Sequence, residues 1–279
     1  MEMKESSIDF EKMQLISSGP LTKTYRAFDV QKTKEVIVKE FTNTDYFDVI
    51  RKSRNEILHL SCEHLPKIYD IINSTKCHCV TMECIKGVPL SKYMYEYQYN
   101  IATVVKIGLD ICDAILCLKN NNMIHLDIKP ANIIYNPYNE KATLIDLDFA
   151  FISNKITNMK FKYIGTINYS SPEQITNNTT SVSSDIYSLG VVLYELVEGK
   201  LPYSNKKQRI LRITNADVDF LFDEKGEDFV FVKTKEIIKQ MLSYEPDQRI
   251  TPECAIKEFE EILFRIKKDE IANLFLKIN

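Results

Sequence analysis

A short window in the middle of the chain gathers side chains that suit the transfer of a highly charged group. Asp127, Lys129 and Asn132 lie close together in the sequence, and Asp146 follows a short apolar run further on. A carboxylate can orient a hydroxyl group and take its proton, and a lysine can neutralise charge on the group being transferred. Oxygen atoms of Asp and Asn are ligands that Mg²⁺ accepts. These residue types in this order therefore predict phosphoryl transfer.

The segment His125–Asn132, with its sequence His-Leu-Asp-Ile-Lys-Pro-Ala-Asn, resembles the catalytic loop of protein kinases. Leu-Ile-Asp at the end of the apolar run resembles that family's metal-binding strand end. The resemblance implies that Asp127 orients the acceptor hydroxyl and that Lys129 neutralises the transferring phosphate. It also implies that Asn132 and Asp146 hold magnesium ions. Turn chemistry alone rarely places four such residues in this order.

Two departures from the family pattern carry consequences. Leu126 stands where most members have an arginine that binds a phosphate on the activation segment. The chain therefore resembles those kinases whose activity is not controlled by that contact. Asp-Leu-Asp at residues 146–148 replaces Asp-Phe-Gly and leaves two candidate metal aspartates. Asp146 is preferred because it follows the strand directly, and Asp148 is the alternative. A side chain at Asp148 also predicts a metal loop that is biased toward one conformation.

The resemblance also assigns residues in the first part of the chain. Lys39 ends the sequence Val-Ile-Val-Lys, where the family has Val-Ala-Ile-Lys, and is expected to hold the α- and β-phosphates of ATP. Glu56 is its expected ion-pair partner, with Glu63 as the alternative. Ser17 and Gly19 lie in the expected nucleotide-covering loop, where only the middle glycine of the family pattern is kept. A loop with fewer glycines predicts a stiffer lid over the phosphates.

The same resemblance predicts the adenine site. A small or branched side chain is expected on one face of the ring and an apolar side chain on the other, with backbone hydrogen bonds from the connector between the two halves of the chain. The residues concerned are Ala27 or Val38 above, Ile134 below, Met82 behind the ring, and Glu83 and Ile85 at the connector.

The segment 165–173 resembles the end of the activation segment in serine/threonine kinases, where the family has Gly-Thr-x-x-Tyr-x-Ala-Pro-Glu. Thr166 is expected to hydrogen-bond Asp127 and Lys129. Lys129 itself belongs to the serine/threonine pattern rather than the tyrosine pattern. These features predict a protein acceptor with a serine or threonine hydroxyl.

Three further residues are expected to hold the second half of the chain together. Asp185 matches the helix aspartate that binds the backbone amides of the catalytic loop. Glu173 and Arg249 are expected to form a buried ion pair, which is a structural role and not a chemical one.

Composition sets limits on the fold and on the partners. With 279 residues and 44% hydrophobic content, the chain can bury a large core but has room for one catalytic unit of two lobes. A net charge of −3 provides no basic field for nucleic acid. No apolar run approaches the roughly 20 residues that span a bilayer, and no signal peptide is recognised, so we expect a cytoplasmic protein, or one in a host cytosol. The seven cysteines are an odd number and are expected to be reduced.

The predicted fold class is α+β, in the two-lobed arrangement of protein kinases. Residues 1–85 predict a small antiparallel sheet with one main helix, and residues 86–279 predict a larger, mostly helical part. The segments 15–27 and 34–41 gather β-forming residues around turn residues and predict a hairpin, and 68–72 and 79–83 predict two further strands. The expected helices are one that ends at 55–60, then 101–119, 186–197, 235–242 and 251–264.

The function predicted from these features is transfer of the γ-phosphate of ATP to serine or threonine hydroxyls of proteins, with Mg²⁺ as cofactor and Mn²⁺ as a substitute. Autophosphorylation is expected, with Ser153, Thr157 and Tyr163 as candidate sites. The main alternative is a pseudokinase that binds nucleotide or a partner without transferring phosphate. A small-molecule kinase is the third reading. The sequence predicts no oligomeric state.

Overall fold

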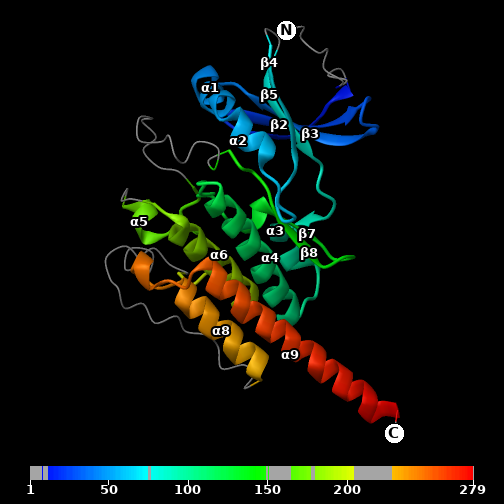
Figure 1. Ribbon diagram of the computed structural model, residues 1–279, viewed down its shortest axis with the longest axis vertical. Helices are drawn as coiled ribbons and strands as arrows, with labels where there is room; N and C mark the ends of the chain where they lie inside the picture. Colours follow the sequence, from blue (N-terminus) through cyan, green and yellow to red (C-terminus); the bar gives the residue numbers. More distant parts are fainter. Residues whose placement is uncertain are drawn as a thin grey trace. The chain divides into compact units, whose positions relative to one another are not determined.

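The chain folds into two compact units, Met1–Lys86 and Gly87–Asn279 (Figure 1). The computed structural model describes residues 8, 12–74, 77–148, 150, 165–176, 180–203 and 228–278. The first unit is rich in strands and the second in helices, which confirms the predicted α+β class.

The first unit is built on a five-stranded antiparallel sheet with the strand order β1-β2-β3-β5-β4. The tight hairpin between β2 and β3 follows from the side chain of Asp29, whose Oδ1 accepts a hydrogen bond from the backbone N–H of Lys32 at 2.9 Å. The strands are β1 (Gln14–Ser18), β2 (Thr22–Asp29), β3 (Lys34–Phe41), β4 (Ile68–Asn73) and β5 (His78–Glu83).

Side chains along β3 point alternately to the two faces of the sheet, and one of these faces is buried. Val36 and Val38 are fully buried and pack with Ala27 and Cys79 in one hydrophobic cluster. Branched side chains favour this position because they fit the pleated surface of a sheet.

Two short helices follow β3, α1 (Thr44–Lys52) and α2 (Arg54–His59), where the sequence predicted one main helix. The break lies at Ser53, whose ψ of 19° departs from helical geometry. Its backbone N–H donates to the carbonyl oxygens of both Val49 and Ile50, at 3.2 and 3.0 Å. The shared hydrogen bond ends the first helix and lets the second begin in a new direction.

The second unit packs its helices around α4, in which half of the residues are buried, and α6, in which most are buried. α4 begins at an Asn100 cap whose side chain accepts from Thr103 N–H, and α6 ends at Gly199 in the left-handed conformation. The helices are α3 (Leu90–Glu96), α4 (Ile101–Asn120), α5 (Pro172–Ile175), α6 (Val182–Glu198), α8 (Phe229–Met241) and α9 (Pro252–Ile278).

A small three-stranded antiparallel sheet, in the order β6-β7-β8, lies beside these helices. Its strands are β6 (Val88–Pro89), β7 (Ile133–Asn136) and β8 (Lys141–Leu144). The carboxylate of Asp110 in α4 accepts from the backbone N–H of Ala142 in β8 at 2.8 Å. Asp127, Lys129 and Asn132 precede β7 in the sequence, and Asp146 follows β8.

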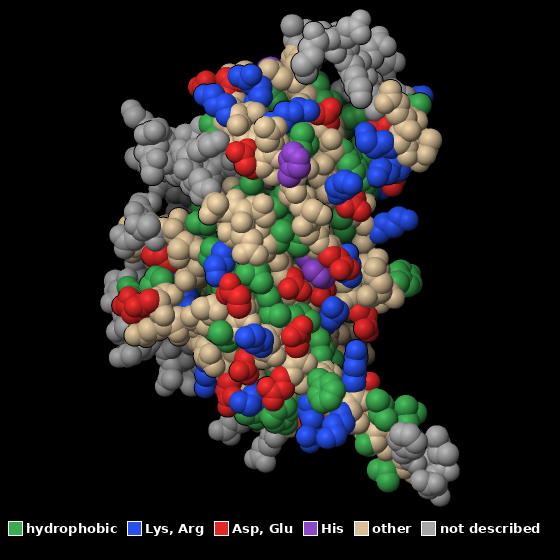
Figure 2. Space-filling view, in the orientation of Figure 1, with side chains coloured by type: hydrophobic (Ala, Val, Ile, Leu, Met, Phe, Trp, Pro, Cys, Tyr) green, Lys and Arg blue, Asp and Glu red, His purple; other side chains and the backbone are tan. Residues whose placement is uncertain are grey.

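α9 continues well past the end predicted at 264. Ile262 is the last buried side chain of α9 in the described part of the chain. Beyond it, helix-forming residues and a 3.2 Å contact between Arg265 and Asp269, one turn apart, continue the helix without core contacts. Figure 2 shows hydrophobic side chains on this end of the molecule, and Phe264 and Leu274 are among the exposed ones.

No helix in the described ranges combines the length and the apolar character that crossing a bilayer requires.

Gly190 in α6 lies where helix packing leaves no room for a side chain. A Cβ atom there would lie 2.8 Å from Cβ of Met241 in α8. We expect Gly190→Ala to lower the free energy of unfolding by about 1–3 kcal/mol, measured by urea denaturation. Gly19→Ala is the control, since the nearest atom to its Cβ would be Thr22 O at 3.6 Å, and it should leave the free energy of unfolding nearly unchanged. An equal or smaller loss for Gly190→Ala would contradict this reading.

Candidate active site

The segment that carries Asp127 is irregular, and its ends are fixed by regular structure. Lys129 is extended, and Pro130 then begins a single turn of 3-10 helix, η2 (Pro130–Asn132), that leads into β7. Asn132 N–H donates to Lys129 O at 2.9 Å and closes the turn. Proline suits the first position of such a turn because it has no N–H to satisfy.

The carboxylate of Asp127 is held between two side chains. Lys129 Nζ lies 2.7 Å from Asp127 Oδ2, and Thr166 Oγ1 donates to Asp127 Oδ1 at 2.8 Å. Lys129 Nζ also donates to Thr166 Oγ1 at 2.9 Å, so the three groups form a closed ring. A carboxylate fixed in this way has one orientation, which is what a group that positions a hydroxyl needs.

Asn132 supports this arrangement and suits a metal ion as well. Its Nδ2 donates to the backbone oxygen and to Oδ2 of Asp127, at 2.9 and 3.0 Å. Since the amide nitrogen is used in this way, Oδ1 is the side-chain atom left for a cation. Ile145 N–H donates to Asn132 O at 2.8 Å, which ties the backbone before Asp146 to Asn132. An amide oxygen and a carboxylate are a donor set that fits Mg²⁺.

Asp185 anchors the segment from α6. Its two oxygens accept from the backbone N–H groups of His125 and Leu126, at 2.7 and 2.8 Å. The side chain is buried, and this burial raises the pKa of Asp185 above its ordinary value. The two hydrogen bonds offset part of the cost of burying the charge.

His125 links the segment to the end of β8, a role that the sequence analysis did not assign. Its Nε2 lies 3.0 Å from Ile145 O, and its Nδ1 accepts from Asp127 N–H at 3.3 Å. An Nδ1 that accepts and an Nε2 that faces a carbonyl oxygen fit the tautomer with a proton on Nε2. The only signal in the sequence was its place in the catalytic-loop motif.

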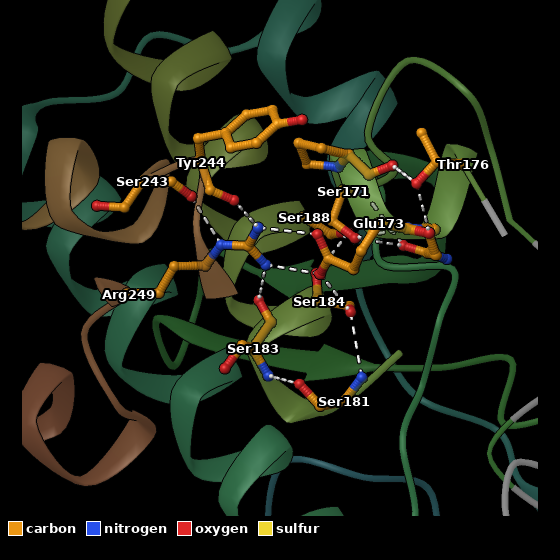
Figure 3. A network of polar contacts seen from close by, with 12 residues as sticks. Ser171, Glu173, Thr176, Ser181, Ser183, Ser184, Ser188, Ser243, Tyr244 and Arg249 are labelled. Atoms are coloured by element: carbon orange, nitrogen blue, oxygen red, sulfur yellow. Dashed lines mark hydrogen bonds and ion pairs between the residues drawn. The ribbon is translucent and has the colours of Figure 1, made fainter. Parts of the chain in front are cut away.

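The ion pair between Glu173 and Arg249 braces α5 against the chain before α9 (Figure 3). Arg249 donates to both carboxylate oxygens, at 2.7 and 2.9 Å, and Ser184 Oγ donates to one of them at 2.6 Å. Burial raises the pKa of Glu173, but these hydrogen bonds and the guanidinium charge outweigh it and hold the pKa below its ordinary value. The remaining guanidinium N–H groups donate to the carbonyl oxygens of Ser183, Ser243 and Tyr244.

Within the first unit, the structure does not bring Lys39 and Glu56 together. Lys39 lies in β3 and is buried, whereas Glu56 lies in the first turn of α2 and is exposed. No ion pair joins the two among the residues that the structure describes. The alternative residue, Glu63, is exposed as well. The pairing of Lys39 with a glutamate stays a prediction.

The expected nucleotide-covering loop is a tight turn in which Gly19 N–H donates to Thr22 O at 2.8 Å. The nearest atom to a Cβ at Gly19 would be 3.6 Å away, so the turn itself does not require glycine. Ser17 is exposed at the end of β1.

The residues expected to contact adenine range from buried to exposed within their own units. Ala27 and Met82 are buried in the first unit, and Glu83 N–H donates to Lys67 O at 2.9 Å. Ile85 is half-buried at the end of that unit, and Ile134 is half-buried in β7 of the second. These assignments stay predictions.

Both candidate metal aspartates follow β8. Asp146 has a positive φ of 67°, which non-glycine residues seldom adopt, and Asp148 is buried. Leu147 between them is buried. The candidate phosphorylation sites Ser153, Thr157 and Tyr163 lie outside the described residues.

Residues 10–259 match the family model of the protein kinase domain, and the chain belongs to that family. The chain is 29% identical over 231 residues to a calcium and calcium/calmodulin-dependent serine/threonine-protein kinase of Lilium longiflorum, covering 80% of this chain and 43% of the relative. It is 27% identical over 255 residues to the serine/threonine-protein kinase PrkC of Bacillus subtilis, covering 88% of this chain and 39% of the relative. The chain therefore spans about two fifths of the length of these relatives.

Among solved structures, the chain is similar to Rad53 1-466 crystallised in complex with AMP-PNP. The TM-score is 0.71 with 18% sequence identity, over 92% of this chain and 65% of that one. This likeness confirms the predicted kinase fold.

Proposed function

We propose that this chain transfers the γ-phosphate of ATP to serine or threonine hydroxyls of protein substrates. The observation that carries the proposal is the carboxylate of Asp127 held in one orientation by Lys129 and Thr166. Membership of the protein kinase family supports it.

In the proposed reaction, the substrate hydroxyl lies against Asp127 and its oxygen attacks the γ-phosphorus. The bond from that phosphorus to the bridging oxygen of ADP breaks, and the hydroxyl proton passes to Asp127 late in the step. Lys129, which already contacts this carboxylate, would neutralise charge on the transferring phosphoryl group. Most of the rate enhancement then comes from positioning and charge compensation.

Mg²⁺, when bound, would offset the negative charge of the phosphates. Asn132 and Asp146 are the residues proposed to hold it. In the first unit, Lys39 would hold the α- and β-phosphates, with Ser17 and Gly19 covering them. Ala27, Met82, Glu83, Ile85 and Ile134 would surround the adenine.

The direct test is transfer of labelled γ-phosphate from ATP with Mg²⁺ or Mn²⁺ to the chain itself, to a basic protein and to small alcohols. We expect label on serine or threonine of the protein and none on the alcohols. Label on the alcohols alone would favour the small-molecule kinase. No label with any acceptor or metal would refute the proposed transfer.

A pseudokinase is the second candidate function, and the exposed position of Glu56 favours it. Active kinases of this family need the ion pair between the strand lysine and the helix glutamate in place. Nucleotide binding by the native chain without transfer of label would support this candidate.

The choice between Asp146 and Asp148 as metal ligand gives a separate prediction. We expect Asp146→Asn to reduce transfer by at least about 10–100-fold and to raise the Mg²⁺ concentration needed for half-maximal rate. Asp148→Asn is the matched control, with a smaller change in both quantities. The measurement is the initial rate as a function of Mg²⁺ at saturating ATP. The reverse order of effects would assign the metal to Asp148.

A further inference from the structure

The carbonyl oxygen of Leu126, one residue before Asp127, is held by a side chain from outside the catalytic loop. Gln174 Nε2 in α5 donates to Leu126 O at 2.7 Å. Both residues are buried, with exposed fractions of 5% for Gln174 and 4% for Leu126. Water therefore does not compete readily for this hydrogen bond, and its loss would leave a buried carbonyl without that donor.

Leu126 has a backbone conformation that needs such support. Its φ is 64°, in the left-handed region, which residues with a side chain rarely adopt. Its N–H donates to Asp185 Oδ1 at 2.8 Å, and its carbonyl accepts from Gln174. The two peptide groups of this residue are therefore fixed by two different helices, α6 and α5. The second of these peptide groups leads directly into Asp127.

Gln174 is itself held in place by the start of its own helix. Its Oε1 accepts from Ser171 N–H at 3.2 Å, and its own N–H donates to Ser171 Oγ at 3.4 Å. This reciprocal capping box uses the oxygen of the amide and leaves the nitrogen to reach Leu126.

Gly165, the residue before Thr166, lies close to the same carbonyl group. Gly165 has a φ of 109°, and a Cβ atom there would lie 2.6 Å from Leu126 O. Only glycine allows this approach. The next residue, Thr166, donates to Asp127. The carbonyl group of Leu126 in the catalytic loop is thus approached both by Gly165 and by Gln174 of α5.

We propose that Gln174 is a positioning residue that fixes the peptide between Leu126 and Asp127 and, through it, the direction of the Asp127 carboxylate. The inference rests on the proposed phosphotransfer. In this chain the residue before Asp127 is a buried leucine and cannot bind a phosphate. The uncharged amide of Gln174 in α5 holds the catalytic loop instead. The geometry of the catalytic loop then does not depend on phosphorylation.

Gln174→Glu tests this role with little change in shape. The new side chain keeps an oxygen for Ser171 N–H but places a second oxygen against Leu126 O, where a donor is needed. We expect kcat at pH 8 to fall at least tenfold, with KM for ATP within twofold of the native value. Toward pH 6 the loss should shrink, because the protonated carboxyl can again donate. Gln174→Met should lose activity to a similar degree but without recovery at low pH.

Ser171→Ala is the matched control, because it removes the hydroxyl of the capping box and keeps the amide nitrogen on Leu126. Its kcat should stay within about threefold of native. If Ser171→Ala costs as much as Gln174→Glu, the cap of α5 explains the effect and the positioning role is wrong. A kcat of Gln174→Glu within twofold of native at every pH would also overturn it.

Hydrogen exchange separates this inference from the proposed function. In Gln174→Glu, the amides of residues 123–129 should exchange at least fivefold faster than in the native chain, and those in α4 should not change. This readout needs no catalysis. If the native chain transfers no phosphate, the proposed function fails, and the exchange rates still decide whether Gln174 positions the loop.

Discussion

Asp127→Asn should abolish most of the phosphotransfer, with a loss of about 10²–10⁴-fold in kcat. An amide cannot take the hydroxyl proton. It also offers one oxygen where the carboxylate offers two, and both carboxylate oxygens are used, one by Thr166 and the other by Lys129. The N–H₂ group of the new asparagine would take the place of one carboxylate oxygen and so face a donor, either Thr166 Oγ1 or Lys129 Nζ. The measurement is the rate of label transfer to a protein acceptor at saturating ATP.

Asp247→Asn is the matched control, since it removes the same charge from an exposed position far along the sequence in the short turn Pro246–Gln248. It should leave the rate within twofold of native. The circular dichroism spectrum of Asp127→Asn should match the native spectrum. Full activity of Asp127→Asn would rule out the role proposed for this carboxylate.

Arg249→Met should destabilise the protein by about 3–5 kcal/mol, because it leaves the carboxylate of Glu173 buried without its partner. Three carbonyl oxygens, those of Ser183, Ser243 and Tyr244, lose a donor at the same time. The measurement is the free energy of unfolding from urea denaturation at pH 7. The double variant Arg249→Met with Glu173→Gln should recover part of the loss, since no charge is then buried.

The pH dependence provides a check on the same pair. The pKa of Glu173 lies below its ordinary value of 4.5 in the folded chain, so the pair adds stability above that pH and the stability is lost as the pH falls through the folded pKa. In Arg249→Met, burial alone would raise the pKa of Glu173. The difference in stability between native and variant should therefore narrow from pH 7 to pH 4. A constant difference would mean that Glu173 is not the cause.

Much of the second unit could be predicted because its signals are local. Proline before Asn132 and an apolar strand before Asp146 define the catalytic loop within a few residues. The predicted contacts of Thr166 with Asp127 and of Asp185 with the loop amides are both present. Each depends on a side chain whose neighbours in the sequence form a recognisable pattern.

Other features depend on contacts that local sequence does not encode. Glu56 lies at the spacing expected for a partner of Lys39, but the helix breaks at Ser53, and Glu56 is exposed on the second part. Gln174 gave no signal, because its role depends on a carbonyl group far away in the sequence. The helix predicted from 186 begins earlier, at Val182, because its first turn carries polar residues outside the apolar pattern. The helix predicted from 235 begins at Phe229, and its first turn is rich in aromatic and β-branched residues, which are weak helix formers.

The helix α9 is continuous, but its two parts differ strongly in local stability. Up to Ile262 the helix shares the core of its unit, so opening it requires disruption of that core. The stretch from Phe264 onward has mostly exposed side chains and is held chiefly by its own backbone hydrogen bonds. Such a helix end frays at almost no free-energy cost, so backbone protection should fall steeply along one unbroken helix. Its melting would leave the active-site residues of the second unit in place.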